Sequence, residues 1–262
     1  SYNIVDCDKR LNPENKRYEI SQEDIDFSAT LVSMILSANK SGENEALNSS
    51  EMEEYKSALR NTYSKDTFDR LPISSIRDTH ATEYRELRVL GYPEHTPFDE
   101  IKEEKYEKFK KPLLHNIINY LKQKESEYRT NNKVKESEMI ASLTFKLETI
   151  FKMTIFSNFS KLDFQEKKII YFETDSIVGG NDYGYLIFAM QSILAKISKK
   201  KQDAKRINKQ DRPLIFFWYE EARNIFSNNL FKEEGVFDRS INEWRSYDML
   251  FIPITQEAQH IP

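Results

Sequence analysis

"PLIFFWYEEARNIF", residues 213–226, passes from bulky apolar side chains to two adjacent carboxylates and then to an amphipathic segment. The apolar part, 214–219, has the length and the aromatic content of a buried strand. Glu220 and Glu221 follow directly where that strand would end, and the residues after them have the apolar spacing of a helix. The stretch therefore predicts a strand that ends at two acids and leads into a helix.

Similar short apolar runs occur elsewhere after Phe156. The segments 168–173 and 249–255 are further predicted strands, and the segments 186–197 and 236–247 have helical apolar spacing. Near-continuous apolar strands that alternate with helices are typical of a parallel sheet covered on both faces. Pro253 predicts a bulge or an end in the last strand, because proline cannot donate a hydrogen bond to a ladder. This part of the sequence predicts an α/β fold.

Residues 21–156 have a different pattern, in which apolar side chains recur every three or four positions and charges fill the gaps. Ser21 with Asp24, and Asn48 with Glu51, are predicted helix starts of the N-cap type. A break is expected around Gly91, and further helices are expected from Pro112 onward. We predict an all-helical region here.

Composition limits the function classes. The chain has 262 residues and a net charge of −4, so its overall charge does not indicate nucleic-acid binding. Its single cysteine, Cys7, cannot form an internal disulfide, and its four histidines lie too far apart for a recognisable metal-ligand spacing. No run of about 18 apolar residues predicts a membrane span, and no signal peptide is recognisable. Contact with a membrane would be peripheral.

One segment concentrates positive charge, the lysine-rich stretch from Lys199 to Lys209. It could bind DNA phosphates or anionic lipid. A solvated connector between a helix and a strand is favoured instead, because no aromatic side chains lie between the lysines for base stacking.

Glu220 and Glu221 have two interpretations. In a parallel sheet, ligands bind beyond the carboxyl ends of the strands. An apolar strand followed by two acids and a helix is the layout of a Walker B element, in which one carboxylate holds Mg²⁺ through water and the next polarises the attacking water. Alternatively, the two acids only begin a helix, whose dipole favours negative charge in its first turn.

Two segments carry a resemblance to a known family. "FFWYEEARNIF" and "NEWRSYDMLFIPITQEAQHIP", residues 216–226 and 242–262, resemble in order two motifs of the large ATPases of conjugative transfer and type IV secretion, in the HerA/FtsK branch of P-loop proteins. The family's Asp-Glu-Ala is matched by Glu220, Glu221 and Ala222. Its arginine-containing helix and Thr-Gln strand end are matched by Arg245, Thr255 and Gln256.

The early segment 2–36 is similar to the family's passage from the nucleotide domain, through an Asn-Pro turn at Asn12 and Pro13, into a helical insertion. The resemblance thus implies a RecA-like parallel sheet of the P-loop NTPase type with a large all-α insertion. It implies that residues 1–20 start the nucleotide-domain segment, that 21–156 are the insertion, and that 157–262 are the α/β ATPase core.

The resemblance also implies roles for single residues. ATP and Mg²⁺ would be the cofactors, with Glu220 holding the metal through water and Glu221 polarising the attacking water. Gln256 would sense the γ-phosphate or position water. Arg245 would be an arginine finger that acts on the next subunit of a hexameric ring, or else a surface arginine on the helix of Trp244.

The chain departs from the family in two ways. None of its six glycines is followed by lysine, so it contains no G-x-x-x-x-G-K-[ST] loop to bind the phosphates. Because the family has that loop before the Asn-Pro turn, we expect Ser1 to begin downstream of it, and we expect the chain alone to bind ATP poorly. Glu220 stands where the family has aspartate, which moves the carboxylate outward by one methylene.

The expected function is that of an ATPase segment powering conjugative DNA transfer or type IV secretion. It would be cytoplasmic and peripheral at the cytoplasmic face of the inner membrane. Its partners would be other secretion-system subunits and, in one version of this hypothesis, DNA. The alternatives are a DNA-pumping translocase of the HerA/FtsK type and a non-catalytic helical interaction module with a degenerate nucleotide fold.

Overall fold

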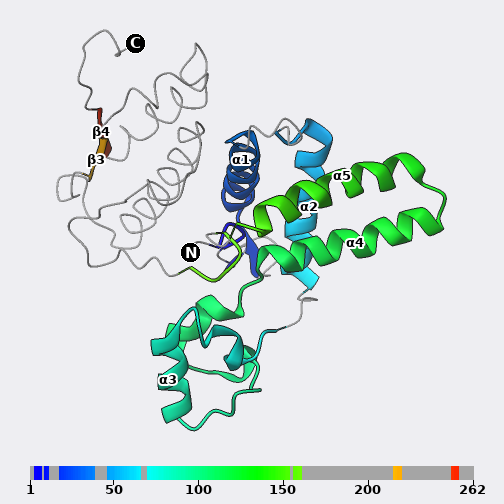
Figure 1. Cartoon of the computed structure of the whole chain (residues 1–262). Helices are drawn as coiled ribbons and strands as arrows, with labels where there is room; N and C mark the ends of the chain where they lie inside the picture. The colour runs from blue at the N-terminus through cyan, green and yellow to red at the C-terminus, as the bar shows by residue number, and fades with distance from the viewer. Residues whose placement is uncertain are drawn as a thin grey trace. The chain divides into compact units, whose positions relative to one another are not determined.

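The computed structural model describes residues 3–7, 9–11, 18–38, 46–65, 70–153, 156–160, 215–219 and 249–253 (Figure 1). The chain forms two compact units. The first comprises Ser1–Leu36 and Glu45–Asp163, and the second comprises Ser37–Asn44 and Phe164–Pro262. Most of the described residues belong to the first unit, which we call the helical unit.

The helical unit is built from α1 (Gln22–Ala38), α2 (Ser49–Lys65), α3 (Ala81–Val89), α4 (Leu114–Thr130) and α5 (Val134–Phe151), with the 3₁₀ helices η1 (Ile73–Ile76), η2 (Phe98–Glu100) and η3 (Glu104–Lys110). The predicted helix starts are confirmed. The Asp24 N–H donates to Ser21 Oγ at 3.1 Å before α1. At α2, Asn48 Oδ1 accepts from the Glu51 N–H at 2.9 Å while Glu51 Oε2 accepts from the Asn48 N–H at 3.0 Å, which is a reciprocal capping box.

Helices α4 and α5 pack against each other as a hairpin, and α2 packs against both (Figure 1). Their buried side chains recur at three- and four-residue spacing, because that spacing lies on one face of a helix. These side chains are Leu114, Ile117, Ile118 and Leu121 on α4 and Ile140, Leu143, Leu147 and Ile150 on α5. The tight turn between the two helices includes Asn132, whose φ is 55°.

The segment from Arg70 to Leu113, which we call the α3 lobe, has a hydrophobic core of its own. The Phe98 and Phe109 rings stack at a centroid distance of 4.8 Å, and Phe159 meets Phe109 edge-on at 5.1 Å. Helix α3 ends before Gly91, whose φ of 92° is a left-handed conformation that favours glycine. Among the described residues from 21 to 156, the extended pairing is confined to an isolated bridge between Pro72 and Pro97.

The N-terminal segment Asn3 to Cys7 is buried within the helical unit. The Tyr63 hydroxyl donates to the Val5 carbonyl at 2.7 Å and accepts from the Cys7 N–H at 3.0 Å, while Ser28 Oγ donates to the Ile4 carbonyl at 2.7 Å. These side chains of α1 and α2 satisfy the backbone of a segment that has no ladder partner of its own. The described part of residues 1–20 packs with the helices, and the assignment of these residues to the start of a nucleotide domain stays a prediction.

Two strand pairs complete the described structure. β1 (Lys9–Leu11) and β2 (Tyr18–Ile20) pair antiparallel; Asn12 and Pro13, between them, lie outside the described residues. β3 (Ile215–Tyr219) and β4 (Met249–Pro253) pair in parallel, from Ile215 opposite Met249 to Tyr219 opposite Pro253. The two predicted strands are confirmed, and Pro253 is the last described residue of β4. The predicted strand 168–173 and the helices 186–197 and 236–247 lie outside the described residues.

The predicted fold class, a RecA-like parallel sheet of the P-loop NTPase type, is wrong. The described part of the chain is mostly helical, and its strands form two separate two-stranded pairs, one of them antiparallel. Phe216 of β3 is 55% exposed, whereas a strand of a doubly covered parallel sheet is buried on both faces. Apolar runs identify single strands, but the number of strands in a sheet depends on pairings between distant segments.

Candidate functional site

Three of the four predicted site residues follow the ends of β3 and β4 in the sequence, and Arg245 lies four residues before β4. Glu220 and Glu221 come directly after Tyr219, and Gln256 comes three residues after Pro253. Glu220, Glu221, Gln256 and Arg245 all lie outside the described residues. The structure therefore describes the two strands that lead to the site.

The parallel register of these strands determines where the chain leaves them. Tyr219 and Pro253 are register partners, so β3 and β4 end at the same edge of the pair. Neighbouring strands are spaced by about 4.8 Å, so Tyr219 and Pro253 lie side by side at this edge. The segment after Tyr219 begins with two carboxylates, and the segment after Pro253 contains Thr255 and Gln256. Carboxylate and amide oxygens of this kind suit Mg²⁺ and its water ligands.

The described residues include His, Cys, Asp and Glu side chains, which are common ligands of metal ions. No group of three or more His, Cys, Asp and Glu side chains that could hold a metal ion occurs in that part of the chain. Glu220 and Glu221 lie outside the described residues. A Mg²⁺ site at the β3–β4 edge therefore stays a prediction.

A charged cluster with a structural role lies between α2 and α5. Glu51 Oε2 is 2.7 Å from Lys146 Nζ, and Ser142 Oγ donates to Glu51 Oε1 at 2.8 Å. Burial alone would raise the pKa of Glu51, but the hydrogen bonds from Lys146, from the Asn48 backbone and from Ser142 outweigh it and lower the pKa. Sequence reasoning identified Glu51 as a capping residue only, because no local pattern indicates a contact with Lys146.

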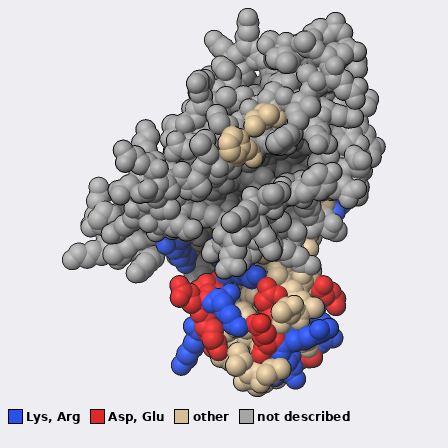
Figure 2. All heavy atoms as spheres, turned by 90° about the vertical axis from the view of Figure 1, so that its left-hand side faces the viewer, with Lys and Arg blue, Asp and Glu red and all other residues tan. Residues whose placement is uncertain are grey.

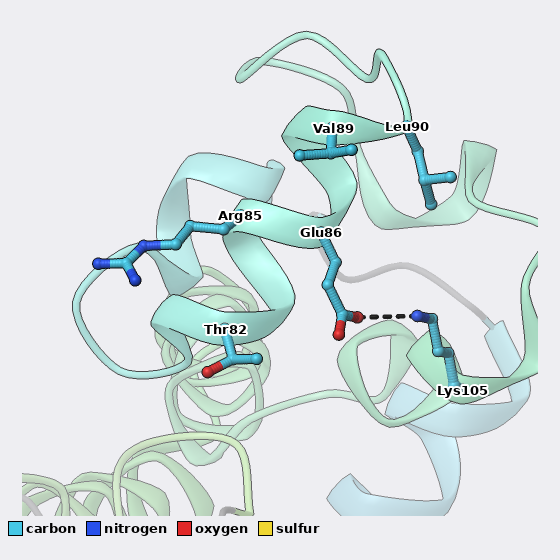
Figure 3. Close-up of a pocket in the computed structure, with 6 residues that line it drawn as sticks. All are labelled: Thr82, Arg85, Glu86, Val89, Leu90 and Lys105. Atoms are coloured by element: carbon cyan, nitrogen blue, oxygen red, sulfur yellow. Dashed lines mark hydrogen bonds and ion pairs between the residues drawn. The ribbon is translucent and has the colours of Figure 1, made fainter.

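A shallow depression of about 410 Å³ lies on the α3 lobe (Figure 3). It is lined by Thr82, Arg85, Glu86, Val89, Leu90 and Lys105. Glu86 Oε2 accepts from Lys105 Nζ at 2.8 Å and from the Tyr106 hydroxyl at 3.1 Å, and these hydrogen bonds lower the pKa of Glu86. Sequence reasoning missed this surface. The sequence feature that indicates this surface is "LRVLGY", residues 87–92. Its apolar side chains lie on more than one side of a short helix, so some of them are left exposed.

Charges of both signs are interspersed on the α3 lobe. The segment Arg70 to Lys111 has as many acidic as basic residues, and the coloured atoms of Figure 2 show the two signs alternating over the lobe. Most of the acids have a basic neighbour, as in the pair between Arg77 and Glu94 at 2.6 Å. The lobe therefore has no single-sign patch on the face shown. The lysine-rich stretch 199–209 lies outside the described residues.

Each of the described helices is too short or too polar to cross a membrane. Comparisons with protein-family models, with curated proteins and with solved structures find no match to this chain. The functional argument therefore depends on the residues themselves.

Proposed function

We propose that the chain belongs to an ATP-hydrolysing protein of conjugative transfer or type IV secretion, and that Glu220 and Glu221 act on bound Mg²⁺-ATP. The observation that carries the proposal is the parallel, in-register pairing of β3 with β4. Because of it, the paired acids and Gln256 follow neighbouring strands at one edge, where ligands of parallel strands bind. The parallel pairing of β3 with β4 supports the proposal without a RecA-like sheet.

The proposal assigns each residue a chemical role. Glu220 holds the water shell of Mg²⁺, and Glu221 polarises the water that attacks the γ-phosphate. Gln256 positions that water or senses the γ-phosphate, and Arg245 acts on the nucleotide of a neighbouring subunit in a hexameric ring. The partners would be other secretion-system subunits and transported DNA, at the cytoplasmic face of the inner membrane.

The Mg²⁺ dependence of ATP binding tests the role of Glu220. The measurement uses a polypeptide that carries this chain together with a G-x-x-x-x-G-K-[ST] loop. In Glu220→Gln we expect ATP binding that responds less to added Mg²⁺, because the amide holds the metal's water ligands less strongly than the carboxylate. ATP binding with the same Mg²⁺ dependence in both proteins would contradict the assignment.

A second function, a non-catalytic helical interaction module, is favoured by the helical unit itself. The unit has a large set of buried apolar side chains, and none of the four predicted site residues falls within its ranges. Under this proposal the helices would bind other subunits and the acids would only begin a helix. The double variant Glu220→Gln, Glu221→Gln would then retain full transfer activity in cells, whereas the ATPase proposal predicts its loss.

A further inference from the structure

Among the described residues, the hydrophobic core of the α3 lobe includes one side chain from outside the lobe. That side chain is Phe159, which follows α5 in the sequence, whereas the other members of the cluster all lie within the lobe. The buried Phe159 ring lies edge-on to Phe109 at a centroid distance of 5.1 Å. We call residues 156–160 the exit segment, because the chain continues from them into the second unit after Asp163.

A buried histidine of the lobe contacts the backbone of the exit segment. His80 precedes α3, and its Nε2 lies 3.4 Å from the Ser160 carbonyl oxygen. A carbonyl oxygen only accepts, so in the neutral ring Nε2 carries the proton and Nδ1 accepts from the Thr79 hydroxyl at 3.1 Å. His80 also lies edge-on to Phe109 at 5.0 Å. The lobe therefore binds both the ring of Phe159 and the carbonyl that follows it.

The two chain ends of the lobe lie together at its base. Arg70 Nη1 donates to the Lys110 carbonyl at 2.6 Å, and Lys111, next to it, pairs with Asp6 of the N-terminal segment. Within the lobe, α3 packs against η1 and η2 packs against η3 (Figure 1). A piece of chain with its own core and adjacent ends can rotate about those ends without unfolding.

We infer that Phe159 is the latch of a hinged lobe. With Phe159 in its pocket the α3 lobe is docked on the exit segment. When Phe159 leaves the pocket, the lobe rotates about the base at Arg70 and Lys110 as one folded piece. The placement of the contacts carries this inference, since the base joins the chain ends and the Phe159 pocket is a second point of attachment. Neither the ATPase proposal nor its residues enter it.

Release of the latch exposes less apolar surface than unfolding of the lobe does. It removes one phenyl ring from the cluster and breaks the His80–Ser160 contact, while the stack of Phe98 on Phe109 at 4.8 Å lies within the lobe and is retained. Proteins open in cooperative units, and the units with the smallest buried contacts open most readily. The latch should therefore open more readily than the lobe unfolds.

The exit segment has an attachment of its own outside the lobe. The Asn3 N–H donates to Ser160 Oγ at 2.9 Å, and Phe156 is buried but does not belong to the cluster of the lobe. The exit segment therefore stays in place when the lobe rotates. Because the same segment leads to the second unit, a pull on that connection would act on Phe159 and would release the lobe.

The first experiment compares two phenylalanines of one cluster by hydrogen exchange and mass spectrometry in the full chain. Phe159→Ala should leave amide exchange in α3 within about twofold of the wild-type rate, because the lobe stays folded without its latch. Phe98→Ala is the matched control, since it removes the same ring from within the lobe, and it should raise exchange in α3 by about tenfold or more. Phe159→Leu is measured alongside as a milder change.

The second experiment measures the position of the lobe. Spin labels at Val89→Cys on α3 and Val134→Cys on α5 report the distance between the lobe and the α4–α5 hairpin, and both positions are exposed. The native Cys7 is buried and stays unlabelled in the folded protein. Phe159→Ala should broaden this distance distribution. The control pair, Thr30→Cys on α1 with Val134→Cys, lies outside the lobe and should keep its distribution.

Three results would overturn the inference. If exchange in α3 rose as much in Phe159→Ala as in Phe98→Ala, Phe159 would be an integral part of the lobe core. An unchanged distance distribution between positions 89 and 134 in Phe159→Ala would show that the lobe is held in place without the latch. A chain that folds with neither Phe159→Ala nor Phe159→Leu would show that the lobe needs this side chain to fold, which also contradicts a releasable latch.

Discussion

The Glu51 carboxylate joins two helices through one buried charge. Its side chain is 2% exposed and that of Lys146 is 12% exposed, so their ion pair is largely removed from water. The Asn48 N–H and Ser142 Oγ supply the remaining hydrogen bonds to the carboxylate. A buried charge that keeps all of its partners is tolerated, whereas one that loses its counter-ion is costly.

We predict that Lys146→Met lowers the free energy of unfolding by about 3 kcal/mol, because it leaves Glu51 buried without a counter-ion. Lys122→Met is the matched control, since Lys122 and Glu148 also form a pair at 2.7 Å but are 53% and 38% exposed. That control should cost less than about 1 kcal/mol. Urea denaturation of both variants measures the difference, and equal losses would show that burial of the Glu51 pair has no special effect.

The pH dependence of stability follows from the direction of the pKa shift. The pKa of Glu51 is lowered in the folded protein, so its contribution to stability is present above the ordinary carboxyl range and is lost as the pH falls through the lowered pKa. In Lys146→Met the pKa of Glu51 rises, because the hydrogen bond and charge of Lys146 no longer offset its burial, so protonation of Glu51 relieves the buried charge and the stability lost through the substitution should shrink as the pH falls. Urea denaturation of both proteins at neutral and at acidic pH would measure this change, and an equal stability difference at both pH values would contradict it.

At the level of elements, the two residues with positive φ in the described part of the chain each follow a helix. Gly91 follows α3 and Asn132 follows α4, and both have left-handed backbones. A Cβ added at Gly91 would meet no heavy atom within 4 Å, so the cost of alanine there would be conformational and not steric.

We predict opposite effects at these two helix ends. Gly91→Ala should destabilise the protein by about 1 kcal/mol, because alanine disfavours the left-handed conformation. Asn132→Gly should be neutral or slightly stabilising, because glycine adopts that conformation without strain. Thermal unfolding of both variants provides the measurement. A stabilising Gly91→Ala would show that the turn after α3 is not held in this conformation.

Local features of the sequence predicted local structure well. Side chains such as Ser21 and Asn48 cap a helix through neighbours three residues away, so the pattern contains both partners. The strand 215–219 was likewise evident from its apolar run. The sheet was not predictable, because pairing joins segments far apart in sequence and local patterns do not record it. The Lys146–Glu51 contact escaped prediction for the same reason.

Of the candidate site, the sequence predicted the two strands that lead to it. The parallel register of β3 and β4 agrees with the expected edge, whereas the roles of Glu220, Glu221, Arg245 and Gln256 stay predictions. Those roles depend on side-chain geometry around a nucleotide, which neither a motif nor a strand pair specifies.

At the level of the whole molecule, the first described residues of the helical unit lie beside its last described residues. The Asn3 N–H donates to Ser160 Oγ at 2.9 Å, and Asn3 Nδ2 donates to the Pro112 carbonyl at 2.9 Å. Segments whose two ends lie together can be inserted into another structure without disturbing their own core.

We predict that residues 1–163 fold without the rest of the chain. The expected result is a helical circular dichroism spectrum and a single cooperative thermal transition, because the buried core of the helical unit lies within these residues. Asn3→Ala should lower the midpoint, since it removes the buried side-chain hydrogen bonds to the Pro112 carbonyl and from the Val5 N–H. A broad, non-cooperative transition of the fragment would show that the helical unit depends on the remainder of the chain.

The most direct test of the central claim, that the paired acids serve ATP hydrolysis, is the Glu221→Gln variant. It is measured in a polypeptide that carries this chain together with a phosphate-binding loop, with steady-state turnover and nucleotide binding determined on the same preparation. We predict that Mg²⁺-ATP binding is retained while turnover falls by about 10²–10⁴-fold, because the amide cannot act as a general base. Unchanged turnover would contradict the claim and would leave Glu220 and Glu221 as the start of a helix.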